Sequence, residues 1–205
     1  MKRVLITGGN GDIAKAIVDE LKKQGDFEID APGKEILDVT SVEAIRCFLT
    51  KFKPDILINN AGYVVPMSIG DCDIESEKKA LDINLFGTFN CTAAVLAINP
   101  NARIINIGSS AATKVHGAWA SYCAAKAGVV MATKCWAEEG YDVVCVSPGR
   151  TATKMRKGLF PDEDQSTLLA AEKFAKVVIR AVNGNYEKGS HINVTKDNAG
   201  DLLND

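Results

Sequence analysis

Residues 3–17 read Arg-Val-Leu-Ile-Thr-Gly-Gly-Asn-Gly-Asp-Ile-Ala-Lys-Ala-Ile, and this stretch is the strongest indication of the fold. Arg3–Thr7 is a short, mostly apolar run that ends at glycines, as a buried strand does. Ile13–Lys23 then carries apolar residues at helical spacing. The glycine-rich turn between them lets backbone N–H groups approach a diphosphate at a helix N-terminus, where the helix dipole favours anions. This order predicts a dinucleotide-binding unit, with a plain strand–helix turn as the alternative.

Strands and helices alternate along the rest of the chain. We predict strands at Arg3–Thr7, Phe27–Ala31, Glu35–Val39, Asp55–Asn59, Arg103–Gly108, Asp142–Ser147 and Ser190–Thr195. We predict helices at Ile13–Lys23, Val42–Phe52, Glu75–Leu96, Trp119–Glu139 and Ala170–Val182. Such alternation is typical of α/β proteins in which a doubly wound parallel sheet lies between two helical layers, a three-layer α/β/α arrangement.

Composition and length limit the class of protein. Hydrophobic residues make up 46% and charged residues 24% of the 205 residues, which is an ordinary globular mixture and excludes disorder or coiled coil as the dominant state. We expect a single domain over residues 1–205, with a short lid at about residues 150–169 and no room for a separate large substrate domain. The net charge of −2 predicts no nucleic-acid partner and no membrane partner.

We find neither a targeting signal nor a metal-binding pattern in this sequence. The apolar run after Lys2 and Arg3 is too short for a signal peptide, and we expect no membrane-spanning helix, which favours a cytoplasmic location. The six cysteines form no C-x-x-C pair, and the only histidines are His116 and His191. We therefore expect reduced, mostly buried thiols and no metal site.

Tyr122, Lys126 and Ser109 make the strongest chemical pattern. Tyr122 and Lys126 are four residues apart in a helical segment and so share a face. A lysine cation beside a phenol lowers the tyrosine pKa from its usual value of about 10, which suits Tyr122 to proton transfer near neutral pH. Ser109 follows a predicted strand at the carboxyl edge of the sheet, where open α/β folds bind ligands.

With these motifs in order, the chain resembles the short-chain dehydrogenase/reductase family over about residues 3 to 195. The motifs that carry the resemblance are Thr7–Ala14, Asp38-Val39, Asn59-Asn60-Ala61-Gly62, Asn84 in D-I-N-L-F-G, Ser109 in I-G-S-S-A, Tyr122-x-x-x-Lys126, and Pro148-Gly149 in S-P-G-R-T-A-T. Ser109 lies thirteen residues before Tyr122, which is the family's usual spacing and favours Ser109 over Ser110. The resemblance implies a Rossmann fold and hydride transfer between NAD(P) and a carbonyl or secondary alcohol.

The resemblance also implies a role for each matching residue. Tyr122 would donate or accept the proton, Lys126 would hold the nicotinamide ribose and depress the Tyr122 pKa, and Ser109 would orient the substrate oxygen. Asn84 would support a water relay toward Lys126. Cofactor contacts are implied for Gly8, Asn10, Gly11, Asp12, Ile13, Lys34, Asp38, Val39, Asn60, Ala61, Gly62, Tyr122, Lys126, Pro148, Gly149, Thr151 and Thr153.

The sequence departs from the family pattern around the second strand and the glycine loop. Asp12 and Ala14 stand at the last two glycine positions of the common G-x-x-x-G-x-G form, and the helix after the second strand is missing. If that strand is Phe27–Ala31, Lys34 lies at its tip and favours NADP(H). If Asp30 reaches the tip instead, NAD(H) is favoured, because a carboxylate hydrogen-bonds the ribose 2′-OH and repels a 2′-phosphate.

Three further points stay open at the level of sequence. Arg150, Lys154, Arg156 and Lys157 indicate either an anionic group on the substrate or a solvated lid helix. The helix that carries Tyr122 is rich in small residues, and the resemblance implies a homodimer or homotetramer built on it. Besides the oxidoreductase hypothesis, we consider a non-catalytic NAD(P)-binding redox sensor and a nucleotide-sugar epimerase or dehydratase.

Overall fold

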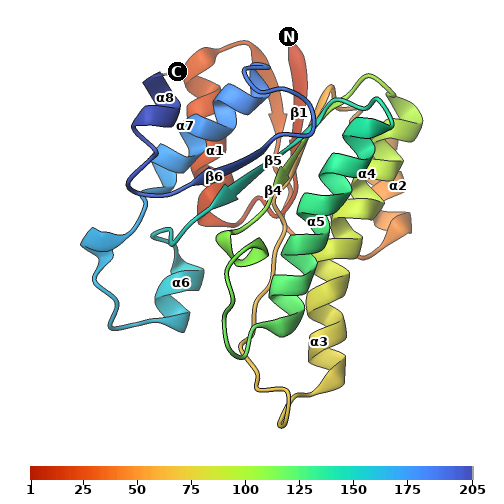
Figure 1. The fold of residues 1–205 in the computed structure, drawn as a ribbon. Helices are drawn as coiled ribbons and strands as arrows, with labels where there is room; N and C mark the ends of the chain where they lie inside the picture. The colour runs from red at the N-terminus through yellow and green to blue at the C-terminus, as the bar shows by residue number, and fades with distance from the viewer. Residues whose placement is uncertain (205) are drawn as a thin grey trace.

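A computed structural model describes residues 1–204 and has a six-stranded, wholly parallel sheet at its centre (Figure 1). The strands are β1 (Lys2–Ile6), β2 (Phe27–Asp30), β3 (Ile56–Asn59), β4 (Arg103–Ile107), β5 (Val143–Pro148) and β6 (His191–Val194). Their order is β2-β1-β3-β4-β5-β6. The chain direction of strand addition reverses between β1 and β3, and ligands bind at such a switch point in open α/β sheets. The predicted doubly wound parallel sheet is confirmed.

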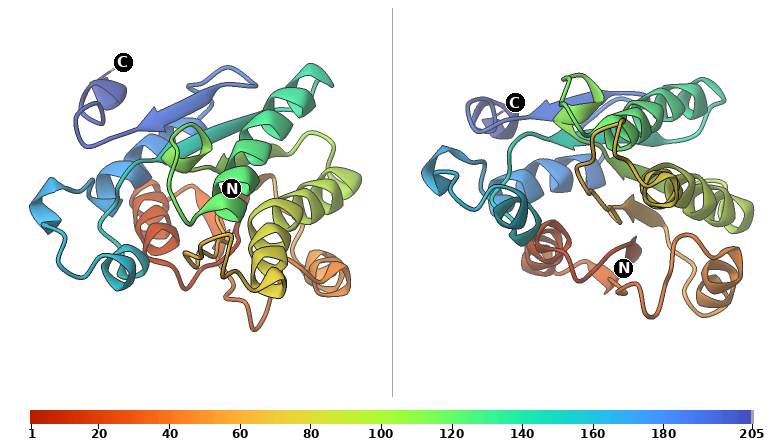
Figure 2. Two further views of the ribbon diagram at one scale, coloured as in Figure 1. Left: turned by 60° about the horizontal axis from the view of Figure 1, so that its bottom comes forward. Right: turned by 90° about the horizontal axis from the view of Figure 1, so that it is seen from below.

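Helices cover both faces of the sheet (Figure 2). The first face packs against α1 (Asp12–Gln24) and α7 (Ala171–Val182), with α8 (Asp201–Asn204) beside α7. The second face packs against α2 (Val42–Lys51), α4 (Gly87–Ile98) and α5 (Ala120–Glu138). The remaining elements are α3 (Ile74–Leu81), the π-helical turn η1 (Asp82–Phe86), α6 (Lys154–Leu159) and the 3₁₀ turns η2 (Ser110–Ala112) and η3 (Gln165–Thr167).

The strand predicted at Glu35–Val39 is wrong. Residues 34–41 form turns, in which the Asp38 carboxylate accepts hydrogen bonds from the backbone and the hydroxyl of Thr40. Leu37 and Val39 alternate with exposed or half-buried residues, which explains the misleading strand pattern, but they pack as loop residues against the second face of the sheet. As a result β2 pairs only with β1 and forms one edge of the sheet.

The long helix predicted at Glu75–Leu96 is divided by a π-helical turn, so that α3, η1 and α4 form one stretch, Ile74–Ile98. By length and composition alone this stretch could cross a membrane, contrary to our expectation from the sequence. In the structure α3 packs against α5, and α4 packs against α2 and β3. The π turn contains the buried Asn84, and π turns are frequent at functional sites.

Four buried polar side chains join two strands to two helices behind the carboxyl edge of the sheet. The Asn59 amide donates to Thr92 Oγ1 on α4 and to Asn106 Oδ1 on β4, both at 2.9 Å. The Asn106 amide donates to Thr133 Oγ1 on α5 at 2.9 Å, and the Thr133 hydroxyl donates to Val129 O at 2.8 Å. All four side chains belong to buried residues. This polar network fixes the position of α4 and α5 relative to β3 and β4.

Replacing Thr133 with Val tests how strongly the polar network holds these elements. The substitution keeps the shape of the side chain but leaves one Asn106 N–H buried without an acceptor, so we expect unfolding free energy to fall by about 1–3 kcal/mol. Thr50→Val is the matched control, because Thr50 also hydrogen-bonds back to its own helix but is exposed, and it should change stability by less than about 0.5 kcal/mol. Urea denaturation measures both; equal effects would contradict the role of the network.

Candidate active site

A cleft of about 460 Å³ lies at the carboxyl edge of the sheet, beside the switch point between β1 and β3. Most residues predicted to hold a cofactor line it: Gly8, Asn10, Gly11, Asp12, Ile13, Lys34, Asp38, Val39, Asn60, Ala61, Gly62, Tyr122, Lys126, Pro148 and Thr153. Gly149, Thr151, Asn84 and Ser109 are not among its lining residues within positions 1–204. Thr151 is buried and donates its hydroxyl to Gly149 O at 3.0 Å.

The glycine loop and the loop after β3 are joined by direct hydrogen bonds. The Thr7 hydroxyl accepts from the backbone N–H groups of Asn60 and Ala61, both at 3.0 Å, while the Asn60 amide donates to Thr7 O. Gly8 has a φ of +69°, and a Cβ there would come within 2.9 Å of the Ala61 backbone. A glycine is therefore required where the two loops meet, and together they form one wall of the cleft.

Asn84 is fully buried and holds the loop that follows β3. Its amide nitrogen donates to Tyr63 O at 2.6 Å and to Ala80 O at 2.8 Å, and its amide oxygen accepts from Tyr63 N at 3.1 Å. These bonds occupy the side chain, so a water relay through Asn84 would use its backbone carbonyl, which accepts from the Thr88 hydroxyl at 3.3 Å. Tyr63, held by Asn84, itself lines the cleft.

Lys126 places a cation in the wall of the cleft with little access to solvent. The residue is 5% exposed, and its ammonium group donates to Ile107 O at 2.9 Å. The same nitrogen lies 5.8 Å from the centre of the Tyr122 ring. Burial lowers the pKa of Lys126 to about 8, because desolvation disfavours the charged form. A small change in surroundings can therefore change its protonation state near neutral pH.

Tyr122 stands next to Lys126 on α5, with the Ser109 side chain nearby. Burial raises the pKa of Tyr122 above its usual value, and a hydrogen bond with the Ser109 hydroxyl offsets part of that rise. The lowered Tyr122 pKa that we expected from Lys126 is wrong for this structure, because desolvation of the phenolate dominates and the ammonium points at Ile107 O. The contact with Tyr122 favours Ser109 over Ser110 as the third member of the set.

The far end of the cleft lies under the turn that follows β2. Lys34 lines the cleft there, and its ammonium is 3.6 Å from the Asp38 carboxylate, which also lines it. Asp30 ends β2 but is not among the cleft residues within positions 1–204. Burial raises the pKa of the Asp30 carboxyl. Gly9 lies against the same turn, and a Cβ at Gly9 would overlap Ala31 O at 1.8 Å, so the glycine loop depends on this close approach.

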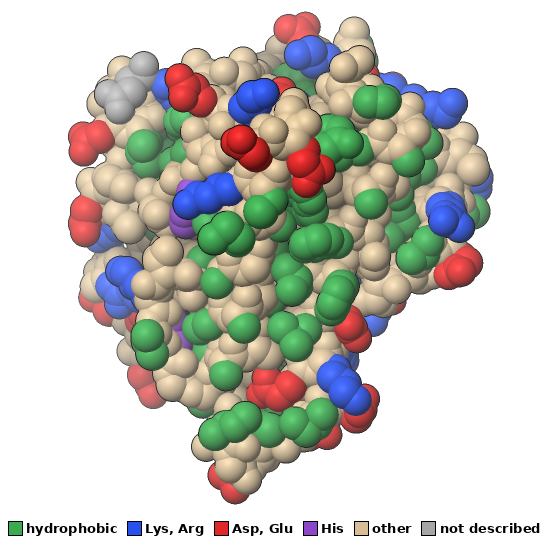
Figure 3. All heavy atoms as spheres, turned by 45° about the vertical axis from the view of Figure 1, so that its right-hand side comes forward, with side chains coloured by type: hydrophobic (Ala, Val, Ile, Leu, Met, Phe, Trp, Pro, Cys, Tyr) green, Lys and Arg blue, Asp and Glu red, His purple; other side chains and the backbone are tan. Residues whose placement is uncertain are grey.

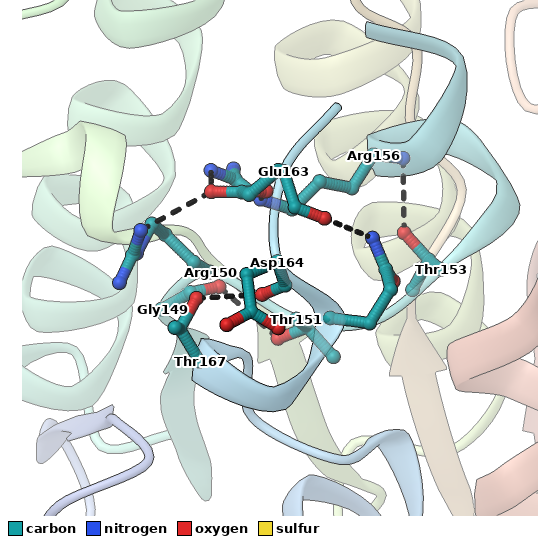
Figure 4. Close-up of polar contacts among 9 residues, drawn as sticks. Gly149, Arg150, Thr151, Thr153, Arg156, Glu163, Asp164 and Thr167 are labelled. Atoms are coloured by element: carbon teal, nitrogen blue, oxygen red, sulfur yellow. Dashed lines mark hydrogen bonds and ion pairs between the residues drawn. The ribbon is translucent and has the colours of Figure 1, made fainter. Parts of the chain in front are cut away.

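The segment that we predicted to be a lid, residues 150–169, is a closed loop with an ion cluster inside it (Figure 4). Its two ends are bridged, because Thr151 pairs with Leu169. Arg150 and Arg156 both contact the Glu163 carboxylate, at 3.1 Å and 2.5 Å, and they hold the pKa of Glu163 below its usual value. Two of the four cations that we considered as contacts for an anionic substrate are thus already paired within the lid.

Aromatic side chains connect the lid to the Tyr122 helix. The Trp119 ring lies edge-on to Tyr122 at 5.6 Å between centroids and 6.1 Å from Phe160, which belongs to the lid. His116 lies 5.2 Å from Trp119, and the Arg156 guanidinium lies over Phe160 at 4.7 Å. These contacts connect α6 to the residues around the start of α5.

Several residues of the site were not predicted from the sequence. Leu37, Lys79, Ile83, Ile107, Gly108 and Met155 also line the cleft. Asn106 and Thr133 of the polar network were missed too. A signal for Asn106 was present, because a carboxamide inside the apolar run Arg103–Gly108 needs a buried partner. Lys79 lies over the Tyr63 ring at 4.8 Å, and a helix surface lysine gives no such signal in the sequence.

Known proteins are similar to this chain in sequence. The family model described as short chain dehydrogenase matches residues 37–164. A 3-oxoacyl-[acyl-carrier-protein] reductase FabG from Haemophilus influenzae is 32% identical over 82% of this chain and 81% of that protein. An uncharacterized short-chain type dehydrogenase/reductase from Sinorhizobium fredii is 30% identical over 74% of this chain, and the match spans 33% of its length.

Solved structures agree on the fold. A 4-hydroxyisoleucine dehydrogenase complexed with NADH has a TM-score of 0.83 at 22% identity and covers 95% of this chain and 96% of that one. ElxO with NADP bound has a TM-score of 0.83 at 23% identity, with 96% and 98% covered. The sheet, the family match and these relatives lead to one conclusion: the chain belongs to the short-chain dehydrogenase/reductase family of oxidoreductases.

Proposed function

We propose that this protein is an NAD(P)-dependent oxidoreductase that interconverts a carbonyl and a secondary alcohol by hydride transfer. The observation that carries the proposal is the convergence of Ser109, Tyr122 and Lys126 beside one cleft, with Lys126 buried and Tyr122 half-buried. Groups of perturbed pKa inside a cleft are typical of catalytic sites. The reductase name of the Haemophilus influenzae relative supports the same class of reaction.

The glycine loop fits the diphosphate of a dinucleotide. The N-cap residue of α1 is Gly11, which has no side chain to cap the helix, so that the N–H groups of the first turn are available to an anion. Asn60, Ala61 and Gly62 would hold the adenosine ribose side, with Asp38 and Val39 at the adenine and Pro148 and Thr153 at the nicotinamide. A bound nicotinamide ring supplies or accepts the hydride.

The chain's own residues handle the proton and the substrate oxygen. Tyr122, protonated because burial raises its pKa, donates a proton to the carbonyl oxygen during reduction and accepts one from the alcohol during oxidation. Ser109 donates a hydrogen bond to the same oxygen and fixes its position next to the phenol. Lys126, which lines the same cleft, binds ribose hydroxyl groups of the cofactor.

Two other functions remain as alternatives to the oxidoreductase. A non-catalytic redox sensor would bind the cofactor tightly without turnover, but the side chains that transfer protons are all present, which favours the enzyme. A nucleotide-sugar epimerase or dehydratase would keep its cofactor without net consumption, and no separate substrate domain lies within residues 1–204. Net oxidation of NADPH in the presence of a ketone separates the enzyme from both.

Tyr122→Phe tests the acid/base role. The variant keeps the ring and its packing on Trp119 but loses the ionisable hydroxyl, and we expect kcat for an accepted ketone to fall by at least about 100-fold while cofactor affinity stays within about 2-fold. Turnover is measured by NADPH absorbance and affinity by fluorescence titration. Tyr141→Phe, at a half-buried position between α5 and β5, is the matched control. Wild-type turnover by Tyr122→Phe would contradict the assignment.

The pH dependence of reduction reports the state of Lys126. Because burial lowers its pKa to about 8, the ammonium is present below that pH and lost above it, so kcat/KM for ketone reduction should fall as the pH rises through about 8. Lys126→Arg keeps its charge throughout this range and should remove the fall near pH 8 even if its absolute rate is lower. A wild-type profile that is flat from pH 6 to pH 9.5 would contradict the assignment.

NADP(H) is the cofactor that we propose as preferred. Lys34 lines the far end of the cleft, whereas Asp30, the residue that would favour NAD(H), does not. A lysine ammonium at this place attracts a 2′-phosphate, although Asp38 at 3.6 Å competes for it.

Lys34→Ala should weaken NADPH binding by about 5- to 10-fold and leave NADH binding within about 2-fold, because only NADPH carries the 2′-phosphate. Lys173→Ala, at an exposed position on α7 away from the cleft, serves as the control for a lost surface charge. Titration of each protein with both cofactors gives the affinities. Equal loss of NADPH and NADH affinity would show that Lys34 does not discriminate between them.

We also propose that the outer face of α4 and α5 pairs with a second copy of the chain. Phe86, Phe89 and Met131 are 54%, 39% and 60% exposed there, and Figure 3 shows hydrophobic side chains gathered over these helices. An anionic substrate stays a prediction that depends on Lys154 and Lys157, since Glu163 occupies both arginines.

A further inference from the structure

Asp12 makes a contact that the cofactor loop does not require for binding a dinucleotide. Its carboxylate accepts a hydrogen bond from the backbone N–H of Lys154 at 2.6 Å, although the two residues are 142 positions apart. Asp12 begins α1 on the glycine-loop side of the cleft, and Lys154 begins α6 in the lid. Both views of Figure 2 place α6 next to α1. One side chain thus connects the two sides of the cleft.

The hydrogen bond between Asp12 and Lys154 links the lid to the glycine loop. Thr153 uses its own hydroxyl to cap the Arg156 N–H at 3.2 Å, so the Lys154 N–H is left for Asp12. Next to it, Ile13 of α1 and Met155 of α6 both line the cleft. The lid therefore meets the glycine loop through one charge-assisted hydrogen bond with apolar side chains nearby, and such bonds are stronger than neutral ones.

The other end of α6 contacts the residues that precede α5. Phe160, at the end of α6, lies 6.1 Å from Trp119, whose ring contacts Tyr122. Within the lid, Glu163 holds Arg150 and Arg156, and the Thr151 and Leu169 bridge closes its base. The lid is consequently a unit that is stiff inside. The Asp12 hydrogen bond, the contact between Phe160 and Trp119 and a hydrogen bond from the Lys196 ammonium to Ser166 O join it to its surroundings.

Charge gives a second reason for the contact. A carboxylate at the start of α1 lies where the proposed function requires a diphosphate, and two anions there would repel each other. Hydrogen bonding to the lid directs the Asp12 carboxylate toward Lys154, whose ammonium side chain also lines the cleft. Asp12 stands where the family pattern has a glycine, and its carboxylate contacts the lid.

We propose that Asp12 is a positioning residue that holds the lid shut over the cofactor cleft, so that breaking its hydrogen bond to Lys154 is a step in cofactor exchange. The inference rests on the proposed function for the part that concerns the cofactor, whereas the closed lid itself is a property of the protein alone. Asp12 acts through the lid and takes no part in proton transfer.

Limited trypsin digestion of the cofactor-free protein tests the lid. The lid offers cleavage sites at Lys154, Arg156 and Lys157, and we expect Asp12→Ala to speed cleavage there by about 5- to 10-fold, corresponding to the loss of one hydrogen bond. Asp12→Asn keeps an acceptor oxygen without the charge and should give a smaller increase. Asp19→Asn is the control, because Asp19 is exposed on the same helix and has no bond to the lid. Far-ultraviolet circular dichroism confirms that each variant is folded.

Stopped-flow release of NADPH tests the second half of the proposal. Asp12→Ala should release NADPH about 5- to 10-fold faster than wild type, and Asp19→Asn should match wild type. Faster lid cleavage in Asp12→Ala with no NADPH binding by any variant would support the closed lid and refute the proposed function instead. NADPH binding with unchanged lid cleavage in Asp12→Ala would overturn the inference, as would faster cleavage with an unchanged release rate.

Discussion

The hydrogen bonds among Asn59, Asn106, Thr92 and Thr133 are the interaction on which the site depends. Each member sits on an element that carries part of the site: β3 leads into Asn60–Gly62, β4 into Ser109, α4 follows Asn84, and α5 bears Tyr122 and Lys126. A buried carboxamide or hydroxyl without a partner is costly, so only one mutual arrangement of these four elements satisfies all of the groups. Apolar packing alone would tolerate small slides of a helix over the sheet, whereas this network does not.

The chain lacks a helix after β2 and forms no strand at Glu35–Val39, and these differences lie away from the residues proposed to transfer the proton. β2 is the edge of the sheet, whereas β4 and α5, which place the residues proposed to transfer the proton, are separated from it by β1 and β3. What changes is the far end of the cleft, where the turn at residues 34–39 takes over from the missing elements and brings Lys34 and Asp38 to the lining. We therefore expect the turn at residues 34–39 to affect binding of the cofactor at the far end of the cleft more than the proposed hydride transfer.

Much of the fold could be predicted from the sequence, because apolar runs ended by glycine and helical spacing are local signals. The position of β4 and of α5 agrees with the prediction to within a residue or two. The local sequence could not show whether Glu35–Val39 is a strand or a loop. Leu37 and Val39 are buried at every second position, as in a strand, although the segment is a loop. The raised pKa of Tyr122 also depends on burial, which the spacing from Lys126 does not report. The contact between Asp12 and Lys154 joins distant parts of the chain, and neither residue marks it alone.

The central claim is that this cleft carries out hydride transfer to a carbonyl carbon. The most direct measurement uses NADPH deuterated at the C4 position of the nicotinamide, each C4 epimer in turn, with a panel of ketones, followed by mass spectrometry of the products. The account predicts that one epimer delivers deuterium to the carbinol carbon of at least one product alcohol, and the other epimer delivers hydrogen. Binding of NADPH with no label in any product alcohol would contradict it.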